Sequence, residues 1–266
     1  MISSRNNPAI KNIVSLSKAA ERRSQNLIIV EGFREIDRAL KAGFVMKQLY
    51  FCPEVGSYEL ISKLNKLMSS NVEVVEVSSG VFEKIAYREG SDGLLALFEP
   101  INISLDDLQP KSNPLLIVLE SVEKPGNLGA VMRTADAASA DAVIVCDPIT
   151  DLYNPNTIRS SLGCIFTVPV VACTTTEAIK WLKGHKIDIF ATSLEASIPY
   201  TECNFKGPSA IVMGTEATGL TPKWLHHSKQ NLIIPMKGIA DSLNISVSAA
   251  IVVFEALRQR LKPINH

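Results

Sequence analysis

Residues 115–120 read LLIVLE, a short apolar run that ends in one acid. Three similar runs follow it, namely AVIVCD at 142–147, IDIFATS at 187–193 and AIVMG at 210–214. Such near-continuous apolar runs are typical of strands that are buried on both faces of a parallel sheet. Helical patterns lie between several of them, at 128–140, 175–185 and 220–229. This part of the chain is therefore predicted to be α/β, with an open and mostly parallel sheet.

The residues before this region predict a second, smaller α/β unit. Strand-like runs at 26–32, 45–52 and 72–78 alternate with helical patterns at 7–24, 33–43 and 57–70. Between the two regions, EPINISLDDLQPKSNP at 99–114 holds three prolines and shows no sustained periodicity. A domain boundary is predicted there, near Pro110.

Composition and charge are those of an ordinary globular protein. The chain has 266 residues and carries 27 Lys and Arg against 27 Asp and Glu, so the net charge alone does not indicate nucleic-acid binding. One local bias exists, because the first 25 residues hold five cations against one acid, Glu21: Arg5, Lys11, Lys18, Arg22 and Arg23. This cluster is either a solvated helix face or a surface that contacts phosphate.

Several classes of protein and site do not fit the sequence. The five cysteines are scattered without C-x-x-C spacing, so neither a disulfide framework nor a metal site is expected. The start has no apolar signal region and no run approaches the length of a membrane span, so a cytoplasmic protein without membrane contact is predicted. The glycines form neither G-x-G-x-x-G nor G-x-x-x-x-G-K-[ST], which argues against a dehydrogenase or a P-loop kinase.

Ligands of open α/β sheets bind beyond the carboxyl ends of the strands, so the residues after each run are candidates for a site. Asn127 and Arg133 follow the first run, within EKPGNLGAVMRTADAA. Asn127 is either a helix cap or a site residue. Glu216 follows the fourth run, within TEATGL, as a loop acid that caps the next helix or serves the site.

A third candidate region is IPMKGIADSLNISVSAAIVVFEALRQR at 234–260. It passes from a strand end through a polar loop directly into an apolar helix. The helix is predicted to pack Val247, Ile251, Phe254 and Leu257 against the sheet. One cap residue would suffice at such a junction, yet four polar side chains are present: Ser242, Asn244, Ser246 and Ser248. This excess of polar groups predicts a site.

Together the stretches EKPGNLGAVMRTADAASADAV, IVMGTEATGL and IPMKGIADSLNISVSAAIVVFEALRQR resemble the three motifs of the SpoU family of RNA ribose 2'-O-methyltransferases, in the SPOUT superfamily. They occur in the family's order and cover most of the chain after about residue 113. The amino-terminal part is similar to the substrate-binding domain often fused to these enzymes, which folds like certain ribosomal proteins. The resemblance implies domains at 1–100 (RNA substrate binding) and 113–266 (methyltransferase), joined by a linker at 101–112.

Further expectations follow from the resemblance alone. The carboxyl-terminal segment would be threaded into a trefoil knot, a topology that general folding rules exclude. S-adenosylmethionine would sit in that knot, no metal would be needed, and the protein would be a homodimer with its sites near the subunit interface. Residues matching the cofactor positions are Gly214, Ile234, Met236 and Leu243, with Thr192 to Leu194 as an addition. Residues matching the polar active-site positions are Asn127, Arg133, Glu216, Ser242 and Asn244.

The implied reaction is methyl transfer to a ribose 2'-hydroxyl, with ribosomal RNA favoured as the substrate. RNA contacts are expected from Arg5, Lys11, Arg22, Arg23 and Arg159. Arg159 lies near either the RNA face or the dimer interface. The alternatives are a transfer-RNA 2'-O-methyltransferase and a non-catalytic RNA-binding protein of ribosome assembly.

Overall fold

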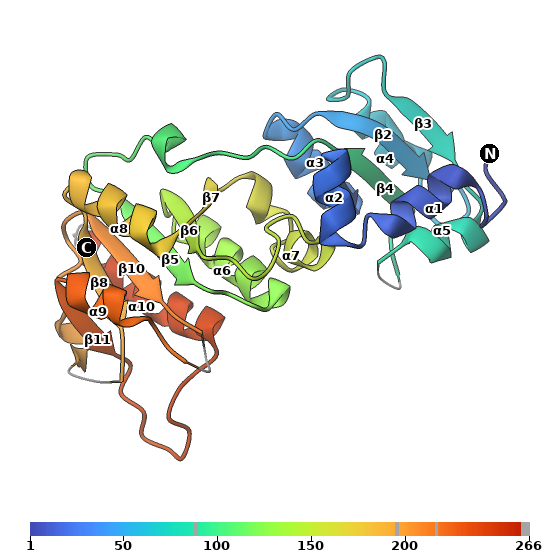
Figure 1. Cartoon of the computed structure of the whole chain (residues 1–266). Coiled ribbons are helices and arrows are strands. Elements are labelled where there is room, and N and C mark those ends of the chain that lie inside the picture. The colour runs from blue at the N-terminus through green and yellow to red at the C-terminus, as the bar shows by residue number, and fades with distance from the viewer. Residues whose placement is uncertain (88–89, 195–196, 216–217, 262–266) are drawn as a thin grey trace, which may run out of the picture. The chain divides into compact units, whose positions relative to one another are not determined.

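A computed structural model describes residues 1–87, 90–194, 197–215 and 218–261 (Figure 1). Contacts divide the chain into two compact units. Unit 1 consists of Met1–Ile101 and Tyr153–Thr167, and unit 2 of Asn102–Leu152 and Val168–His266. No helix in the described ranges is long and apolar enough to cross a membrane.

Unit 2 is built on a seven-stranded sheet in the order β7-β6-β5-β10-β8-β11-β9, and every pairing between neighbouring strands is parallel. The strands are β5 (Leu115–Glu120), β6 (Ala142–Cys146), β7 (Val170–Cys173), β8 (Asp188–Thr192), β9 (Ile198–Pro199), β10 (Ser209–Met213) and β11 (Gln230–Ile233). The four apolar runs of the sequence form β6, β5, β10 and β8, which are adjacent in the sheet. The prediction of a mostly parallel α/β sheet is confirmed.

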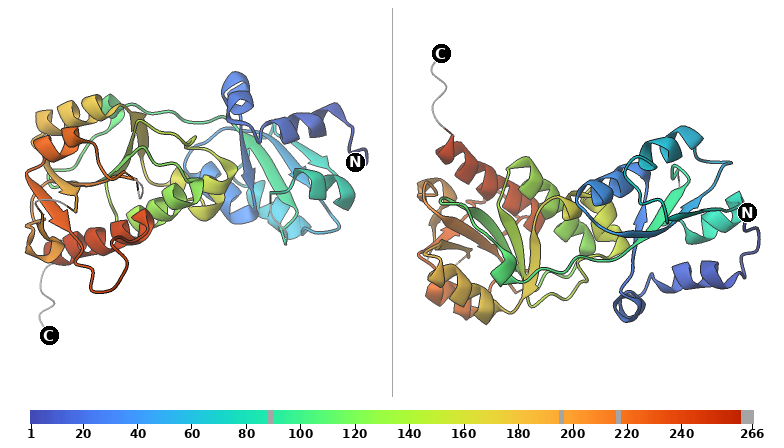
Figure 2. Two further views of the ribbon diagram at one scale, coloured as in Figure 1. Left: turned by 60° about the horizontal axis from the view of Figure 1, so that its bottom comes forward. Right: turned by 90° about the horizontal axis from the view of Figure 1, so that it is seen from above.

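Helices cover both faces of this sheet. Two of them, α6 (Pro125–Ala137) and α10 (Ile245–Arg260), lie side by side on one face, whereas α8 (Thr175–Gly184) and α9 (Pro222–His227) lie on the other (Figure 2). On the α8 and α9 face, the fully buried Trp224 of α9 packs in a cluster with side chains from β5, β6, β8 and β10. This cluster fixes the helices against the sheet and so positions the loops at its carboxyl edge.

The prediction of which α10 residues pack against the sheet is wrong. Val247 and Phe254 are each 46% exposed, and Ile251 and Leu257 are only partly buried. The helix instead buries five other residues: Ile245, Ala249, Val252, Val253 and Ala256. Alanines on this face let the helix lie close to its neighbour α6, so the larger apolar side chains are left outward.

Arg260, the last residue of α10, ties the helix to the amino ends of two strands. Its guanidinium donates hydrogen bonds to Asn113 O (3.0 Å) and Pro114 O (3.1 Å), just before β5, and to Phe205 O (2.9 Å) and Gly207 O (2.6 Å), before β10. Burial lowers the pKa of this guanidinium from its ordinary value, with Asp141 acting in the opposite direction.

Replacing Arg260 with Met is expected to lower the free energy of unfolding by about 2–4 kcal/mol, because four carbonyl acceptors lose a charged donor. Arg258→Met is the matched control, since the exposed Arg258 pairs with Glu255 of the same helix, and Glu255 keeps a second donor in Gln259, so the loss should be less than about 1 kcal/mol. Urea titrations followed by circular dichroism measure both values. Equal losses in the two variants would contradict this role for Arg260.

Unit 1 contains a four-stranded sheet in the order β1-β4-β2-β3, in which β4 runs antiparallel to both neighbours and β2 and β3 are parallel. The strands are β1 (Ile28–Glu31), β2 (Met46–Phe51), β3 (Glu73–Glu76) and β4 (Leu94–Phe98). The helices are α1 (Pro8–Ser15), α2 (Ala19–Gln25), α3 (Phe33–Lys41), α4 (Tyr58–Leu64), α5 (Ser79–Ile85) and α7 (Pro155–Ser160). The central strand β4 was not among the predicted strands.

Residues 153–167, which lie between β6 and β7 in the sequence, belong to unit 1. The ring of Phe44 packs edge-on against Tyr153 and Phe166, at centroid distances of 5.9 and 4.9 Å. Arg38 donates from its guanidinium to Leu162 O at 2.7 Å, and the Tyr153 hydroxyl donates to Ile101 O at 2.6 Å. Unit 1 is therefore completed by a segment that is distant in the sequence.

The segment 101–112, predicted as a linker, has local structure. It contains the 3-10 turn η1 (Leu105–Asp107), closed by a capping box between Ser104 and Asp107. Leu105 and Leu108 pack against the α8/α9 side of the unit 2 core. From Asn102 onward this segment belongs to unit 2.

Candidate functional site

Unit 2 contains a cavity of about 510 Å³ at the carboxyl ends of β8, β10 and β11. This is where ligands bind in open α/β sheets, and the volume lies within the range of small-molecule sites. Its apolar wall comprises Leu194, Met213, Leu220, Leu225, Leu232, Ile233, Ile234, Met236, Leu243 and Ile245. Its polar and glycine positions are Thr192, Ser193, Gly214, Thr215, Thr218, Gly219, Asp241, Ser242 and Ser248.

The structure brings all four expected cofactor positions to this one cavity. Gly214 follows β10, Ile234 and Met236 follow β11, and Leu243 precedes α10. Thr192, Ser193 and Leu194 join them from the end of β8. A lining that combines leucine and isoleucine side chains with hydroxyl groups fits a ligand with apolar and polar parts, as S-adenosylmethionine has.

Gly214 sits at a close approach of the backbone. A Cβ built there would overlap the carbonyl group of Gly219, because the loop folds back on itself. Gly219 N–H donates to Thr215 O at 3.0 Å, which closes the turn. A side chain at 214 would therefore displace the cavity wall formed by Thr218, Gly219 and Leu220.

Gly214→Ala is accordingly expected to weaken S-adenosylmethionine binding about tenfold, equivalent to about 1.4 kcal/mol. Gly238→Ala is the matched control, because a Cβ at Gly238 meets nothing within 4 Å and this residue does not line the cavity. Titration calorimetry of both variants makes the comparison. Unchanged affinity in Gly214→Ala would show that the loop tolerates the side chain.

Two of the expected polar site residues are in direct contact. Asn244 Nδ2 donates to Asn127 Oδ1 at 3.1 Å, although the two residues are 117 positions apart. Asn244 is also the N-cap of α10, since its Oδ1 accepts from Ser246 N–H at 2.9 Å. Asn127 lies in the first turn of α6, which begins at Pro125 after Lys124, so Asn127 is not the helix cap.

Adjacent side chains just before α10 lie in two different places, the cavity and the contact with α6. Ser242 and Leu243 line the cavity, whereas Asn244 contacts Asn127 on α6 and is not among the lining residues. Arg133, further along α6, is exposed and has no hydrogen-bond partner among the described residues. Glu216 lies outside the described residues.

Two acids of this region were not among the predicted site residues. Asp241 lines the cavity and accepts a hydrogen bond from the Ser242 hydroxyl at 3.3 Å. Glu120, the last residue of β5, is buried and accepts hydrogen bonds from Thr175 and Thr221. The acid that ends LLIVLE was the available signal for Glu120, because an acid that ends a buried strand needs partners. No group of three or more potential metal ligands occurs within the residues that the structure describes.

The cations expected to contact RNA all belong to unit 1. Lys11 and Arg23 are exposed, and Arg5 is exposed while contacting Gly80 O and Glu83. Arg22 differs, because it is only 3% exposed and donates to Leu16 O at 2.7 Å and Ser17 O at 2.8 Å. Its guanidinium holds the turn between α1 and α2. Arg22 is therefore too buried for the phosphate contact that was expected of it.

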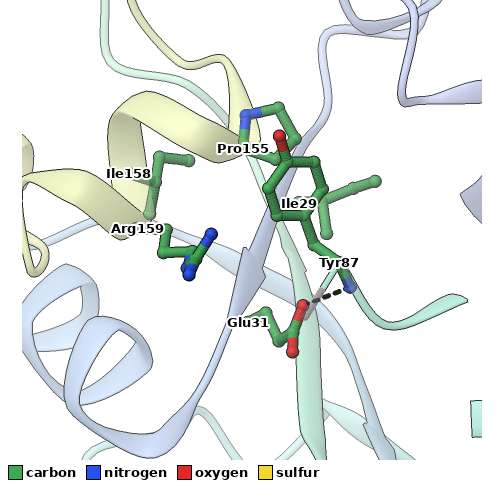
Figure 3. Close-up of a pocket in the computed structure, with 6 residues that line it drawn as sticks. All are labelled: Ile29, Glu31, Tyr87, Pro155, Ile158 and Arg159. Atoms are coloured by element: carbon green, nitrogen blue, oxygen red, sulfur yellow. Dashed lines mark hydrogen bonds between the residues drawn. The ribbon is translucent and has the colours of Figure 1, made fainter. Parts of the chain in front are cut away.

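Arg159 lies on α7, within the part of unit 1 that comes from residues 153–167. Its exposed side chain borders a small cavity of about 20 Å³ shared with Ile29, Glu31, Tyr87, Pro155 and Ile158 (Figure 3). Tyr87 N–H donates to Glu31 Oε2 there at 2.6 Å. The volume admits about one water molecule, so this hollow is not a ligand site by itself.

Family models match both parts of the chain. The model of the SpoU rRNA Methylase family matches residues 114–254, and that of the MRM3-like substrate binding domain matches residues 7–96. The first of these covers more than half of the chain, including the whole cavity at the edge of the sheet.

Individual relatives agree with these matches along almost the whole chain. The 23S rRNA (guanosine(2553)-2'-O)-methyltransferase RlmP of Bacillus subtilis is 29% identical over 95% of this chain and 97% of that protein. A crystal structure of an RNA 2'-O ribose methyltransferase is 40% identical, covers 97% of this chain and 98% of its own, and has a TM-score of 0.86. An AdoMet-bound rRNA methyltransferase from Sinorhizobium meliloti is 30% identical, covers 98% of both chains and has a TM-score of 0.88. The chain therefore belongs to the SpoU rRNA methylase family.

Proposed function

We propose that this chain transfers the methyl group of S-adenosylmethionine to a ribose 2'-hydroxyl of 23S ribosomal RNA. The observation that carries the proposal is the cavity at the edge of the sheet, where the four expected cofactor positions meet. Relatives named as 23S rRNA 2'-O-methyltransferases support the substrate, and the AdoMet-bound structure supports the cofactor.

The cavity residues would hold the cofactor. Gly214 lets the loop after β10 close tightly, and Ile234, Met236 and Leu243 supply apolar wall. When bound, S-adenosylmethionine supplies a methyl group on a sulfonium, whose leaving group is already good. The protein must then mainly align the reactants and manage one proton.

Arg133 would grip a phosphate of the RNA and stabilise the developing alkoxide. A guanidinium has no acceptor at neutral pH, so it does not suit the role of general base. Its side chain is exposed, and within the described ranges no residue accepts a hydrogen bond from it, which supports a role toward a ligand. Asn127 and Asn244 would hold the ribose and this arginine, while Ser242 and Glu216 would order the loops.

A homodimer is part of the proposal. The outward face of α10 carries Val247 and Phe254, both nearly half exposed, which is typical of a surface that another chain covers. The polar residues on α6 do not line the cavity of their own chain, so a partner that brings its α6 to the cavity would complete the site. Analytical ultracentrifugation tests this part, and a monomer at micromolar concentration would refute it.

The remaining assignments rest on the family. Residues 1–100 would bind the RNA substrate, 101–112 would connect the parts, and 113–266 would form the methyltransferase domain with a carboxyl-terminal trefoil knot. The match of residues 7–96 to a substrate-binding domain supports the first assignment. Action on ribosomal RNA would place the protein in the cytoplasm, where that RNA is transcribed and assembled in bacteria.

The test is transfer of a tritiated methyl group to RNA from cells that lack this protein. Ribosomal and transfer RNA are offered separately, and labelled 23S RNA is digested to nucleosides to identify the 2'-O-methylated product. Label in 23S RNA alone is the expected result. Label only in transfer RNA would change the substrate class, and S-adenosylmethionine binding without any label would favour a non-catalytic RNA-binding role.

A further inference from the structure

Glu120 is a buried carboxylate that no role in the proposed reaction uses. It ends β5 and is only 2% exposed. Three hydrogen bonds satisfy it: Oε1 accepts from the hydroxyls of Thr175 and Thr221, both at 2.8 Å, and Oε2 accepts from Thr221 N–H at 2.7 Å. A buried carboxylate is tolerated only with such partners, so the arrangement around it is well determined.

Thr221 connects this carboxylate to the cavity. It directly follows Thr218, Gly219 and Leu220, which line the cavity after the loop that begins at Gly214. The start of that loop is fixed by the sheet, because Met213 is paired with Leu119. The other end is held by Glu120 through Thr221, so the carboxylate anchors one wall of the cavity.

The way Thr221 uses its hydroxyl supports this view. Thr221 is the N-cap residue of α9, where a threonine side chain usually accepts from the helix backbone. Here it makes no such cap, and the hydrogen bond that its side chain makes is the one donated to Glu120. The side chain of Thr221 therefore serves the carboxylate and not the helix end.

We infer that Glu120 is a positioning residue for the cofactor, which acts through Thr221 on the wall formed by Thr218, Gly219 and Leu220. This rests on the proposed function, in which that cavity holds S-adenosylmethionine. Methionine in place of Glu120 has a similar length but no oxygen acceptor, so the Thr221 N–H group and both threonine hydroxyls would lose their partner. The loop end would then move, because a buried N–H group without an acceptor is costly.

The first measurement is S-adenosylmethionine binding by Glu120→Met beside wild type, together with KM for each substrate. The dissociation constant and the KM for S-adenosylmethionine are expected to rise about tenfold, while the KM for RNA stays within about twofold of wild type. A purely structural role would lower the melting temperature without this split between the two KM values.

Variants of the threonine partners keep the inference testable if Glu120→Met does not fold. Thr221→Val loses the hydroxyl and is expected to weaken cofactor binding about threefold or more, whereas Thr221→Ser keeps both donors and should bind within about twofold of wild type. Thr175→Val removes the contact toward α8 only and is also expected to stay within about twofold.

The outcomes separate this inference from the proposed function. Wild type that does not bind S-adenosylmethionine would refute the proposed function. Wild type that binds, together with unchanged affinity in Thr221→Val and in folded Glu120→Met, would overturn the role of Glu120. Equal weakening by Thr175→Val and Thr221→Val would also overturn it, because the effect would then not pass through the loop.

Discussion

Replacing Leu243 with Arg is expected to abolish S-adenosylmethionine binding, with an increase in the dissociation constant of at least about 100-fold. Leu243 is partly buried and lines the cavity together with Gly214 and Ile234. An arginine there adds volume to the cavity and a positive charge beside a positively charged sulfonium. Without a counter-charge, the guanidinium either remains poorly solvated in the cavity or displaces the ligand from it.

The matched control for this variant is Ile239→Arg. Ile239 lies in the same segment between β11 and α10, but it is fully exposed and does not line the cavity. Titration calorimetry gives both affinities, and circular dichroism checks that both proteins are folded. Wild-type affinity in a folded Leu243→Arg protein would show that the cofactor binds elsewhere, and a similar loss in both variants would indicate a general effect of added charge.

The centre of the unit 2 sheet was predictable because burial on both faces leaves a direct mark on the sequence. The runs that became β5, β6, β8 and β10 are apolar along nearly their whole length. Shorter strands leave less evidence, as in β7, with four residues, and β9, with two. The fully buried β4 of unit 1 was missed because LLALF is too short for its period to distinguish a strand from a buried helix.

The face of α10 shows where periodicity fails. Val247 and Phe254 share one side of the helix with two further apolar residues, and that spacing predicted the face that packs against the sheet. The structure instead turns Ala249 and Ala256 inward, and α10 lies against α6. Sequence periodicity identifies the apolar faces of a helix, but it does not say which of two such faces packs against the rest of the chain and which stays exposed.

The candidate site was predictable in part from the rule that ligands bind at strand ends. The rule selected the segments after β5, β10 and β11, and the resemblance to the family assigned roles to their residues. The structure shows in addition that two adjacent residues contact different partners: Leu243 lines the cavity, whereas Asn244 donates a hydrogen bond to Asn127. Glu120 was missed because its partners, Thr175 and Thr221, are far from it in sequence and carry no recognisable motif.

Arg133→Lys is expected to lower kcat at least about 100-fold, the size of effect seen when one donor to a developing oxyanion is removed. The guanidinium can offer two parallel donors to a phosphate, whereas an ammonium is a point charge and cannot reproduce that geometry. The affinity for S-adenosylmethionine should stay within about twofold of wild type, because Arg133 does not line the cavity. Stability should also be unchanged, because the side chain is exposed and has no hydrogen-bond partner among the described residues.

Single-turnover methyl transfer at saturating S-adenosylmethionine measures this effect on the chemical step. Arg258→Lys is the matched control, since Arg258 is an exposed arginine of the same unit that pairs with Glu255 one turn away on its own helix. Its turnover is expected to equal that of wild type. Near-normal turnover in Arg133→Lys would show that charge alone suffices at this position, so the bidentate grip would be wrong. A loss confined to the KM for RNA, with kcat intact, would instead assign Arg133 to RNA binding without a part in the transition state.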